Sequence, residues 1–258
     1  MIHPTFAAVL FAGGLFLGML GMQELGRRMG SRRLAENPEY ARGIGPVEGA
    51  LFGLLGLLLA FTFSGAVSRF DDRRLLITEE VNAIGTAWLR IDLLPANAQP
   101  NLRDLFRRYV DSRLETYRKL PDIAAAEAEL AHSVALQGEI WKASVAALRL
   151  PEAQVGNVTV VNSLNEMFDV VTKRTDAART HPPSIIYAML AFFALVAALL
   201  AGFGMAEGQA RSWLHVIGFA AVLSLTTYVI LDIEYPRHGF VRVDAFDRSL
   251  VELRRSMD

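Results

Sequence analysis

The sequence predicts an all-α membrane protein with four transmembrane helices and a helical soluble bundle between the second and third spans. Four runs of at least 20 residues contain no Asp, Glu, Lys or Arg: residues 1–23, 49–68, 181–206 and 212–231. A helix needs about 20 apolar residues to cross the hydrocarbon core of a bilayer. The long segment between the second and third runs, residues 69–181, has helical periodicity and no strand-like alternation.

Composition and charge exclude several classes of protein. Of the 258 residues, 52% are hydrophobic and 21% are charged, and no cysteine is present. The absence of cysteine excludes disulfides, thiol catalysis, and zinc or iron–sulfur sites with cysteine ligands. Lys and Arg number 26 against 27 Asp and Glu, so no net basic field exists to attract nucleic acid. We therefore expect the lipid bilayer to be a partner of this chain, and nucleic acid not to be one.

The first span, residues 1–23, is expected to be a retained transmembrane helix rather than a signal peptide. His3 is its only titratable side chain, so it lacks a basic N-terminal region, and no small-residue cleavage site precedes Gln23. A basic loop is predicted to follow over residues 24–48. Its five arginines are Arg27, Arg28, Arg32, Arg33 and Arg42.

The second span, residues 49–68, is expected to continue as a helix to about residue 94 and to join the soluble bundle. Between residues 70 and 94 there is no proline, and the only glycine is Gly85. Apolar residues keep a helical spacing through this stretch. A continuous helix of about 45 residues would be roughly 65 Å long, because an α-helix rises 1.5 Å per residue.

Small residues recur three or four positions apart along the second span, so they share one helical face. The members of this small-residue stripe are Gly49, Gly53, Gly56, Ala60, Ser64 and Ser68, with Gly45 one turn earlier. Two interpretations are open: close packing between helices, which small residues permit in membranes, or a face that lines a pore or meets another subunit. A shorter stripe of the same type occurs in the first span, at Gly14, Gly18 and Gly21.

Three amphipathic helices are predicted within the soluble bundle, residues 69–181, with apolar stripes in residues 102–117, 130–148 and 155–171. The second stripe consists of Leu130, Val134, Trp141, Val145 and Leu148. Helices of this type bury their stripes against one another. The third span is then predicted at residues 182–206, the fourth at 212–231, and a C-terminal tail at 232–258.

Charged residues follow both the second and the fourth span, on the same side of a four-span protein. Arg69 and Arg73 lie one helical turn apart, and Asp232 and Glu234 follow the fourth span. Because unpaired charges near hydrocarbon lose hydration, we expect Asp232 or Glu234 to lie within salt-bridge reach of Arg69 or Arg73. The alternative is that all four side chains extend to water and lipid headgroups.

No catalytic constellation is found in the sequence. The five histidines lie far apart without metal-ligand spacing, and no metalloprotease, phosphate-loop or nucleophile-elbow motif occurs. Asp71-Asp72 and Glu79-Glu80 are adjacent pairs, whose side chains point about 100° apart on a helix, so each pair indicates a solvated or salt-bridged face. We expect no enzyme activity, no cofactor and no metal site. No charged residue occupies the middle of a span, which argues against a proton pump or voltage sensor but permits a passive pore.

Two stretches of the chain resemble a known family. FTFSGAVSRFDDRRLLITEEVNAIGTAWLRIDLLP covers residues 61–95, and LDIEYPRHGFVRVD covers residues 231–244. Together with the four-span layout, they resemble the bacterial bestrophin-like domain family over most of the chain. True bestrophins are pentameric anion channels with four spans per subunit, a pore lined by the second span, and both termini in the cytosol. No acidic calcium clasp is recognisable in this chain, so the resemblance does not extend to calcium gating.

By analogy, the resemblance implies a homo-oligomeric anion channel of the cell inner (plasma) membrane, with the soluble bundle and both termini cytoplasmic. Nine Lys and Arg residues lie near the spans on the side of the bundle and the termini, against six on the side of the loop 24–48, and the more basic side is usually cytoplasmic. The first span alone favours the opposite orientation, because five arginines follow it and no basic residue precedes it. The competing function is a membrane-anchored interaction or sensory module that acts through its helical bundle. Both functions use the same fold, so subunit number and ion flux distinguish them.

Overall fold

The computed structural model describes residues 4–36, 44–120, 122–152, 157–207, 212–237 and 239–258, and these residues form helices and connecting turns without a β-strand. The chain divides into two compact units. The membrane unit comprises Met1–Ser68 and His181–Val241, and the bundle unit comprises Arg69–Thr180 and Arg242–Asp258. Each unit has its own hydrophobic core.

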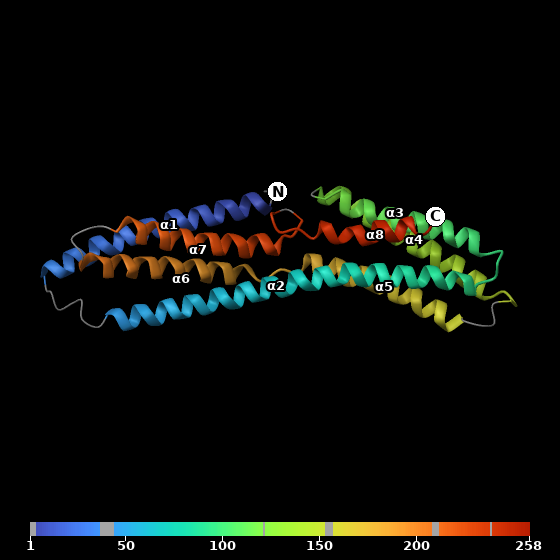
Figure 1. Ribbon diagram of the computed structural model, residues 1–258, viewed down its shortest axis with the longest axis horizontal. Helices are drawn as coiled ribbons and strands as arrows, with labels where there is room; N and C mark the ends of the chain where they lie inside the picture. The colour runs from blue at the N-terminus through green and yellow to red at the C-terminus, as the bar shows by residue number, and fades with distance from the viewer. Residues whose placement is uncertain (1–3, 37–43, 121, 153–156, 208–211, 238) are drawn as a thin grey trace. The chain divides into compact units, whose positions relative to one another are not determined.

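Four helices of the described chain are long and apolar enough to cross a membrane. They are α1 (Pro4–Glu36), α2 (Ile44–Arg90), α6 (Ser184–Gly204) and α7 (Trp213–Glu234). Within the membrane unit, α1 packs along both α6 and α7 (Figure 1). The core between the spans is built from Met19, Leu55, Ala194, Ala197, Ala198, Ala220 and their neighbours.

Glycines bring α1 and α6 into backbone contact. A Cβ atom on Gly26 would lie 1.9 Å from the carbonyl oxygen of Leu199, and one on Gly202 would lie 2.0 Å from the carbonyl oxygen of Gln23. Gly30 meets Phe203 in the same way, with its carbonyl oxygen 2.8 Å from the Cβ position. Only residues without a side chain permit this approach, which is how small residues promote helix association in membranes.

The helix ends differ from those predicted by the sequence. The first helix continues to Glu36 and the second begins at Ile44, so much of the basic loop predicted for residues 24–48 is helical. Gly26 and Gly30 do not interrupt α1, because packing on α6 covers them. The fourth span ends at Glu234 rather than at residue 231, which places Asp232 and Glu234 within α7. Arg42 lies outside the described residues.

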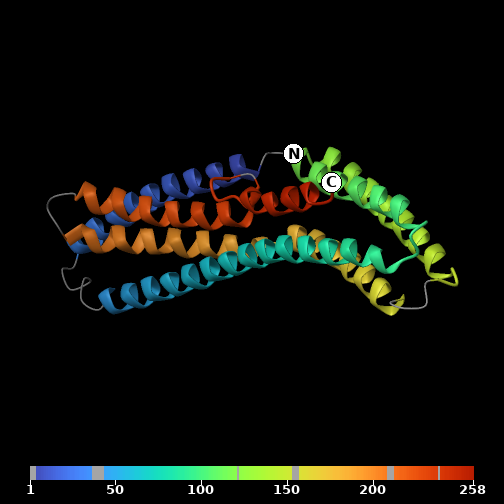
Figure 2. The same ribbon diagram turned by 45° about the vertical axis from the view of Figure 1, so that its right-hand side comes forward.

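The bundle unit begins within α2, which runs from the membrane unit to Arg90 without a break between Ser68 and Arg74. It continues through a 3₁₀ turn, η2 (Ile91–Leu93), to α3 (Gln99–Arg118), α4 (Ile123–Leu148) and α5 (Asn157–Arg179) (Figure 2). The N-terminus of α4 is capped by Asp122, whose carboxylate accepts the N–H of Ala125 at 3.1 Å.

The C-terminal residues belong to the bundle core rather than forming a separate tail. The short helix η4 (Asp244–Asp247) leads into α8 (Arg248–Arg255), and the side chains of Leu250 and Met257 are buried in the bundle core. Arg107 donates to the carbonyl of Met257 at 2.9 Å. The predicted tail, residues 232–258, is therefore divided between the end of α7, a connecting loop, and this docked segment.

The three predicted bundle stripes match the buried faces to different degrees, and the α4 stripe contributes only Leu130 and Leu148 to the edge of the core. On α3, Leu102, Leu105, Phe106 and Tyr109 are all buried, as the pattern predicts. On α4, the core instead receives Ser133, Leu136, Ile140, Ser144 and Ala147. Val134 and Trp141, members of the predicted α4 stripe, are 53% and 37% exposed. On α5 the core face is centred on Val160, Leu164, Met167 and Val170, close to the predicted one.

Candidate functional site

The small-residue stripe of α2 is exposed along its whole length. Of the four spans, α2 has the smallest share of its apolar window buried, 11%, against 17%, 28% and 39% for the others. Gly49, Gly53, Gly56, Ala60, Ser64 and Ser68 are all exposed. A Cβ atom on Gly49, Gly53 or Gly56 would meet no described atom within 4 Å. Among the described residues, therefore, no other span of the same subunit packs against these three glycines.

Large apolar side chains flank the stripe on the same helix. Leu57 and Phe61 are 51% and 67% exposed, and Leu54 and Phe63 are exposed as well. The hydroxyl of Thr62 donates to the carbonyl of Leu58 at 2.7 Å, so it is used within its own helix. This face of α2 thus combines small residues with apolar ones and carries no charge between Gly49 and Ser68.

Asp232 holds the loop that follows α7. Its carboxylate accepts the backbone N–H groups of Phe240 and Val241, each at 2.9 Å, and the hydroxyl of Tyr228 at 3.3 Å. A Cβ atom on Gly239 would lie 1.8 Å from this carboxylate, so glycine is required for the loop to approach. These donors offset the unfavourable placement of a carboxylate at a helix C-terminus.

The contacts of Glu234 and Arg73, two further members of the predicted charge cluster, lie at helix ends. Glu234 is 1% exposed, and its carboxylate lies 3.6 Å from Nδ1 of His181, whose ring stacks on Tyr235. Arg73 donates to the carbonyls of Ala177 and Thr180, at 3.0 and 2.9 Å, where α5 ends. Arg69 lies one turn before Arg73 on α2. The expected salt bridge between these arginines and Asp232 or Glu234 stays a prediction.

The bundle unit contains a buried charge network, for which the sequence indicated only a solvated or salt-bridged face at Glu79-Glu80. Glu80 of α2 is fully buried, and its Oε1 atom lies 2.5 Å from Nε of Arg113 on α3. Its other oxygen pairs with Arg174 of α5, and Arg174 reaches on to Asp247 of η4 at 2.9 Å. The guanidinium of Arg174 also lies 3.7 Å from the ring centre of Tyr117, a cation–π contact. One carboxylate therefore joins α2 to α3 and α5, and through Arg174 to the C-terminal segment.

The electrostatics of this network favour its charged form. Burial raises the pKa of the Glu80 carboxyl, but the combined effect of the Arg113 and Arg174 guanidinium groups is larger and lowers the pKa to about 2. Burial lowers the pKa of Arg113, whereas Tyr117 and Glu80 raise it, and the net direction is upward. The sequence does contain a signal for this network, because both charged residues share a helical face with buried apolar residues. Glu80 lies on the same face as Ile77 and Ile84, and Arg113 on the face of Phe106 and Tyr109, so both charges fall on buried stripes.

A second polar cluster joins α3 to α4. The hydroxyl of Ser112 donates to Glu129 at 2.7 Å, and Nδ1 of His132 lies 3.0 Å from the same carboxylate oxygen and 3.5 Å from the Ser112 hydroxyl. In a catalytic triad the serine and the acid contact opposite nitrogens of the histidine ring. Here both lie beside Nδ1, so these three side chains do not have the arrangement of a catalytic triad. Together with Lys119, which pairs with Glu129 at 2.6 Å, they tie the two helices together.

The fold and these sites define an integral membrane protein with four spans and a helical bundle formed by the segment between the second and third spans and the C-terminal residues. The sequence profile of the Bestrophin-like domain matches residues 12–245, and the chain belongs to this family. A comparison with curated protein sequences finds no match.

Solved structures share this fold. Two single-substitution variants of a bacterial bestrophin homologue from Klebsiella pneumoniae are similar to this chain over almost its full length. One is 16% identical with a TM-score of 0.63, and the alignment covers 94% of this chain and 95% of that one. The other is 17% identical with a TM-score of 0.60, and covers 92% and 98%.

Proposed function

We propose that this chain forms a homo-oligomeric, bestrophin-like anion channel in which α2 lines the central pore. The observation that carries the proposal is the exposed face of α2, where no described atom of the same subunit lies within 4 Å of a Cβ position on Gly49, Gly53 or Gly56. A ring of such faces around an axis would bring the α2 helices together where small residues allow close approach. Membership of the Bestrophin-like family supports this arrangement, with a pentamer as the expected assembly by analogy with bestrophins.

A pore of this composition would conduct passively. The face from Gly49 to Ser68 has no charge, and its exposed apolar side chains, Leu57 and Phe61, form candidate constrictions. Arg69 follows the stripe immediately and would concentrate anions at that mouth of the pore. We propose the orientation of bestrophins, with the bundle and both termini in the cytoplasm and the spans in the cell inner (plasma) membrane.

The second candidate function is a membrane-anchored interaction or sensory module. It is favoured by exposed apolar side chains on the bundle unit, where Val134 and Trp141 of α4 and Val158 of α5 face outward. In this case the bundle would bind another protein and the spans would serve as an anchor.

Subunit number and ion flux separate the two functions. We expect the purified protein to be an oligomer in detergent by native mass spectrometry, and to release chloride from loaded liposomes. Replacement of Phe61 by Ala should raise the flux if α2 lines the pore, whereas the same replacement at Phe192, an exposed residue of α6, should leave it unchanged. A strictly monomeric protein, or liposomes without flux above protein-free controls, would exclude the channel and favour the module.

A further inference from the structure

At one end of the membrane unit, contacts show which residues of α1, α6 and α7 lie side by side. The side-chain amide of Gln23 donates to the carbonyl of Val216 at 3.3 Å, which places this part of α1 beside the first turn of α7. Gly26 contacts the backbone of Leu199 and Phe203, near the end of α6. The segment of α1 that starts at Gln23 therefore lies alongside the end of α6 and the start of α7.

The neighbouring turns at this level are apolar. Residues 199–206 contain no charged side chain. On α7, Trp213 is 57% exposed and Leu214 is 82% exposed. Tryptophan is enriched where membrane helices meet the interface between hydrocarbon and headgroups. This level of the membrane unit therefore corresponds to the headgroup region, and α1 passes through it.

The part of α1 at this level is strongly basic. Arg27 and Arg28 are followed one turn later by Arg32 and Arg33, and the side chains of Arg27 and Arg28 are 40% and 69% exposed. Acidic residues also lie nearby: Glu24 and Glu36 are on α1, Glu48 is on α2, and Glu207 ends η3 (Met205–Glu207). Glu24 pairs with Arg28 at 2.7 Å and with Arg27 at 3.5 Å.

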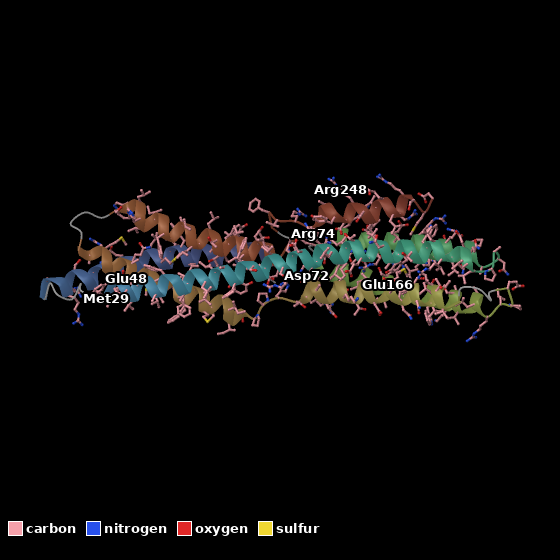
Figure 3. All side chains as sticks on the ribbon, turned by 60° about the horizontal axis from the view of Figure 1, so that its bottom comes forward. Met29, Glu48, Asp72, Arg74, Glu166 and Arg248 are labelled. Atoms are coloured by element: carbon pink, nitrogen blue, oxygen red, sulfur yellow. The ribbon has the colours of Figure 1, made fainter. Side chains whose placement is uncertain are left out.

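The carboxylate of Glu48 lies 3.0 Å from the position of a Cβ atom on Gly204. Arg28 and Arg32, one turn apart on α1, are both exposed. Exposed apolar side chains, Leu25 and Met29, stand between the arginines. Figure 3 labels Met29 on α1 and Glu48 at the start of α2, within the same unit.

We propose that the exposed face of α1 with Arg28, Arg32, Leu25 and Met29 binds anionic phospholipids through their phosphate groups. Guanidinium groups bind phosphate oxygens in a bidentate manner. Leu25 and Met29 would contact the adjoining acyl chains, which a soluble phosphate ester does not supply. The binding is independent of ion conduction and would occur in either orientation of the protein.

Lipid titration of the purified full-length protein tests this site. Native mass spectrometry would count bound phosphatidylglycerol and, separately, phosphatidylcholine with the same acyl chains. We expect the wild type to prefer phosphatidylglycerol, and the preference to fall at high salt. Arg28→Gln with Arg32→Gln should raise the half-saturating concentration about fivefold for each arginine removed. Arg28→Lys with Arg32→Lys should keep most of the preference.

The matched control is Arg108→Gln with Arg118→Gln, two exposed arginines of α3. If the control loses as much binding as the α1 variant, if the wild type binds both lipids equally, or if the α1 variant binds like wild type, the site is wrong. Glycerol 3-phosphate, which has no acyl chains, should not compete at equal concentration, and competition would show a soluble phosphate site instead. Should the double glutamine variant not fold, Arg32→Gln alone provides the same comparison, with an increase of about fivefold.

Discussion

At the residue scale, the carboxylate of Glu80 links α2 to α3 and α5 and, through Arg174, to η4. It neutralises Arg113 and Arg174, which are 1% and 6% exposed, and Arg174 also pairs with Asp247. Buried ion pairs contribute little net stability compared with apolar packing, but removing one partner leaves an uncompensated buried charge. The network therefore makes the bundle sensitive to single substitutions.

We predict that Glu80→Gln destabilises the protein by about 3–5 kcal/mol, the usual cost of breaking a buried pair. The neighbouring change Glu79→Gln is the control, because Glu79 is exposed, and it should stay within about 0.5 kcal/mol of wild type. Denaturant unfolding followed by far-ultraviolet circular dichroism would measure both. Equal stability of the two variants would show that the network does not hold the bundle together.

The pH dependence of stability follows from the lowered pKa of Glu80. Its carboxyl titrates at about 2 in the folded protein against 4.5 for an ordinary glutamate, so the folded state favours the ionised form. The stabilisation is complete above about pH 4.5 and is lost as pH falls from there towards 2. Glu129, whose pKa is also lowered to about 2 by its hydrogen bonds with Lys119, Ser112 and His132, loses its contribution in the same window.

We predict that the melting temperature of wild type falls between pH 4.5 and 2.5, and falls less steeply in Glu80→Gln, which cannot titrate at this position. Glu79→Gln should follow the wild-type profile. Differential scanning fluorimetry across the pH series would measure the difference between the profiles. Parallel profiles for wild type and Glu80→Gln would contradict the assignment of the low pKa.

At the element scale, the glycines of α1 differ in what surrounds them. A Cβ atom on Gly14 meets no described atom within 4 Å, whereas one on Gly26 would overlap the carbonyl oxygen of Leu199. We predict that Gly26→Ala disrupts the α1–α6 contact and lowers the melting temperature in detergent. Gly14→Ala should be neutral or slightly stabilising, because alanine favours a helix by up to about 1 kcal/mol over glycine. Similar melting temperatures for both variants would show that α1 and α6 do not approach this closely.

The sequence predicted the type and number of the long helices better than their contacts. The four spans and the uninterrupted α2 follow from the absence of charges and of prolines. The stripe of α3 was predictable because large apolar residues there occupy one face only. On α4, Ser133, Ser144 and Ala147 line the core beside Leu136 and Ile140, while Val134 and Trp141 lie outside, so the predicted stripe was rotated away from the buried face. Hydrophobic periodicity does not detect a contact made by small side chains.

The sites were less predictable than the helices. Of the predicted stripe at Gly14, Gly18 and Gly21, only Gly18 meets α6, at the side chain of Leu195, whereas the backbone contacts with α6 occur at Gly26 and Gly30, beside arginines. The burial of Leu250 and Met257 could not be predicted from the residues around them, because the core surface that covers them is formed by residues far away in the sequence. The spacing of residues defines a helical face, but only the folded chain shows what that face meets.

At the scale of the whole molecule, α2 alone among the described helices contributes residues to both units. Its membrane half exposes the small-residue stripe, and its second half supplies Glu80 to the bundle core. A subunit interface along the stripe would therefore involve a helix that is fixed in the bundle by a buried charge. This arrangement makes assembly testable separately from folding.

We predict that Gly53→Leu prevents assembly of the oligomer while the subunit still folds. Nothing described lies within 4 Å of a Cβ atom at this position, and Gly53 is exposed, so a leucine there should leave folding of the subunit unaffected. Against a neighbouring subunit the added side chain would overpack the contact, at a cost of typically about 1–3 kcal/mol per interface. Because a closed ring repeats the same contact at every interface, the cost multiplies with the number of subunits.

The matched control is Gly14→Leu on α1, which is also exposed and also has no described atom within 4 Å of its Cβ position. Native mass spectrometry should find smaller species for Gly53→Leu and the wild-type assembly for Gly14→Leu, with equal helical content in both. An intact oligomer in Gly53→Leu would place the stripe against lipid or open water instead of a second subunit.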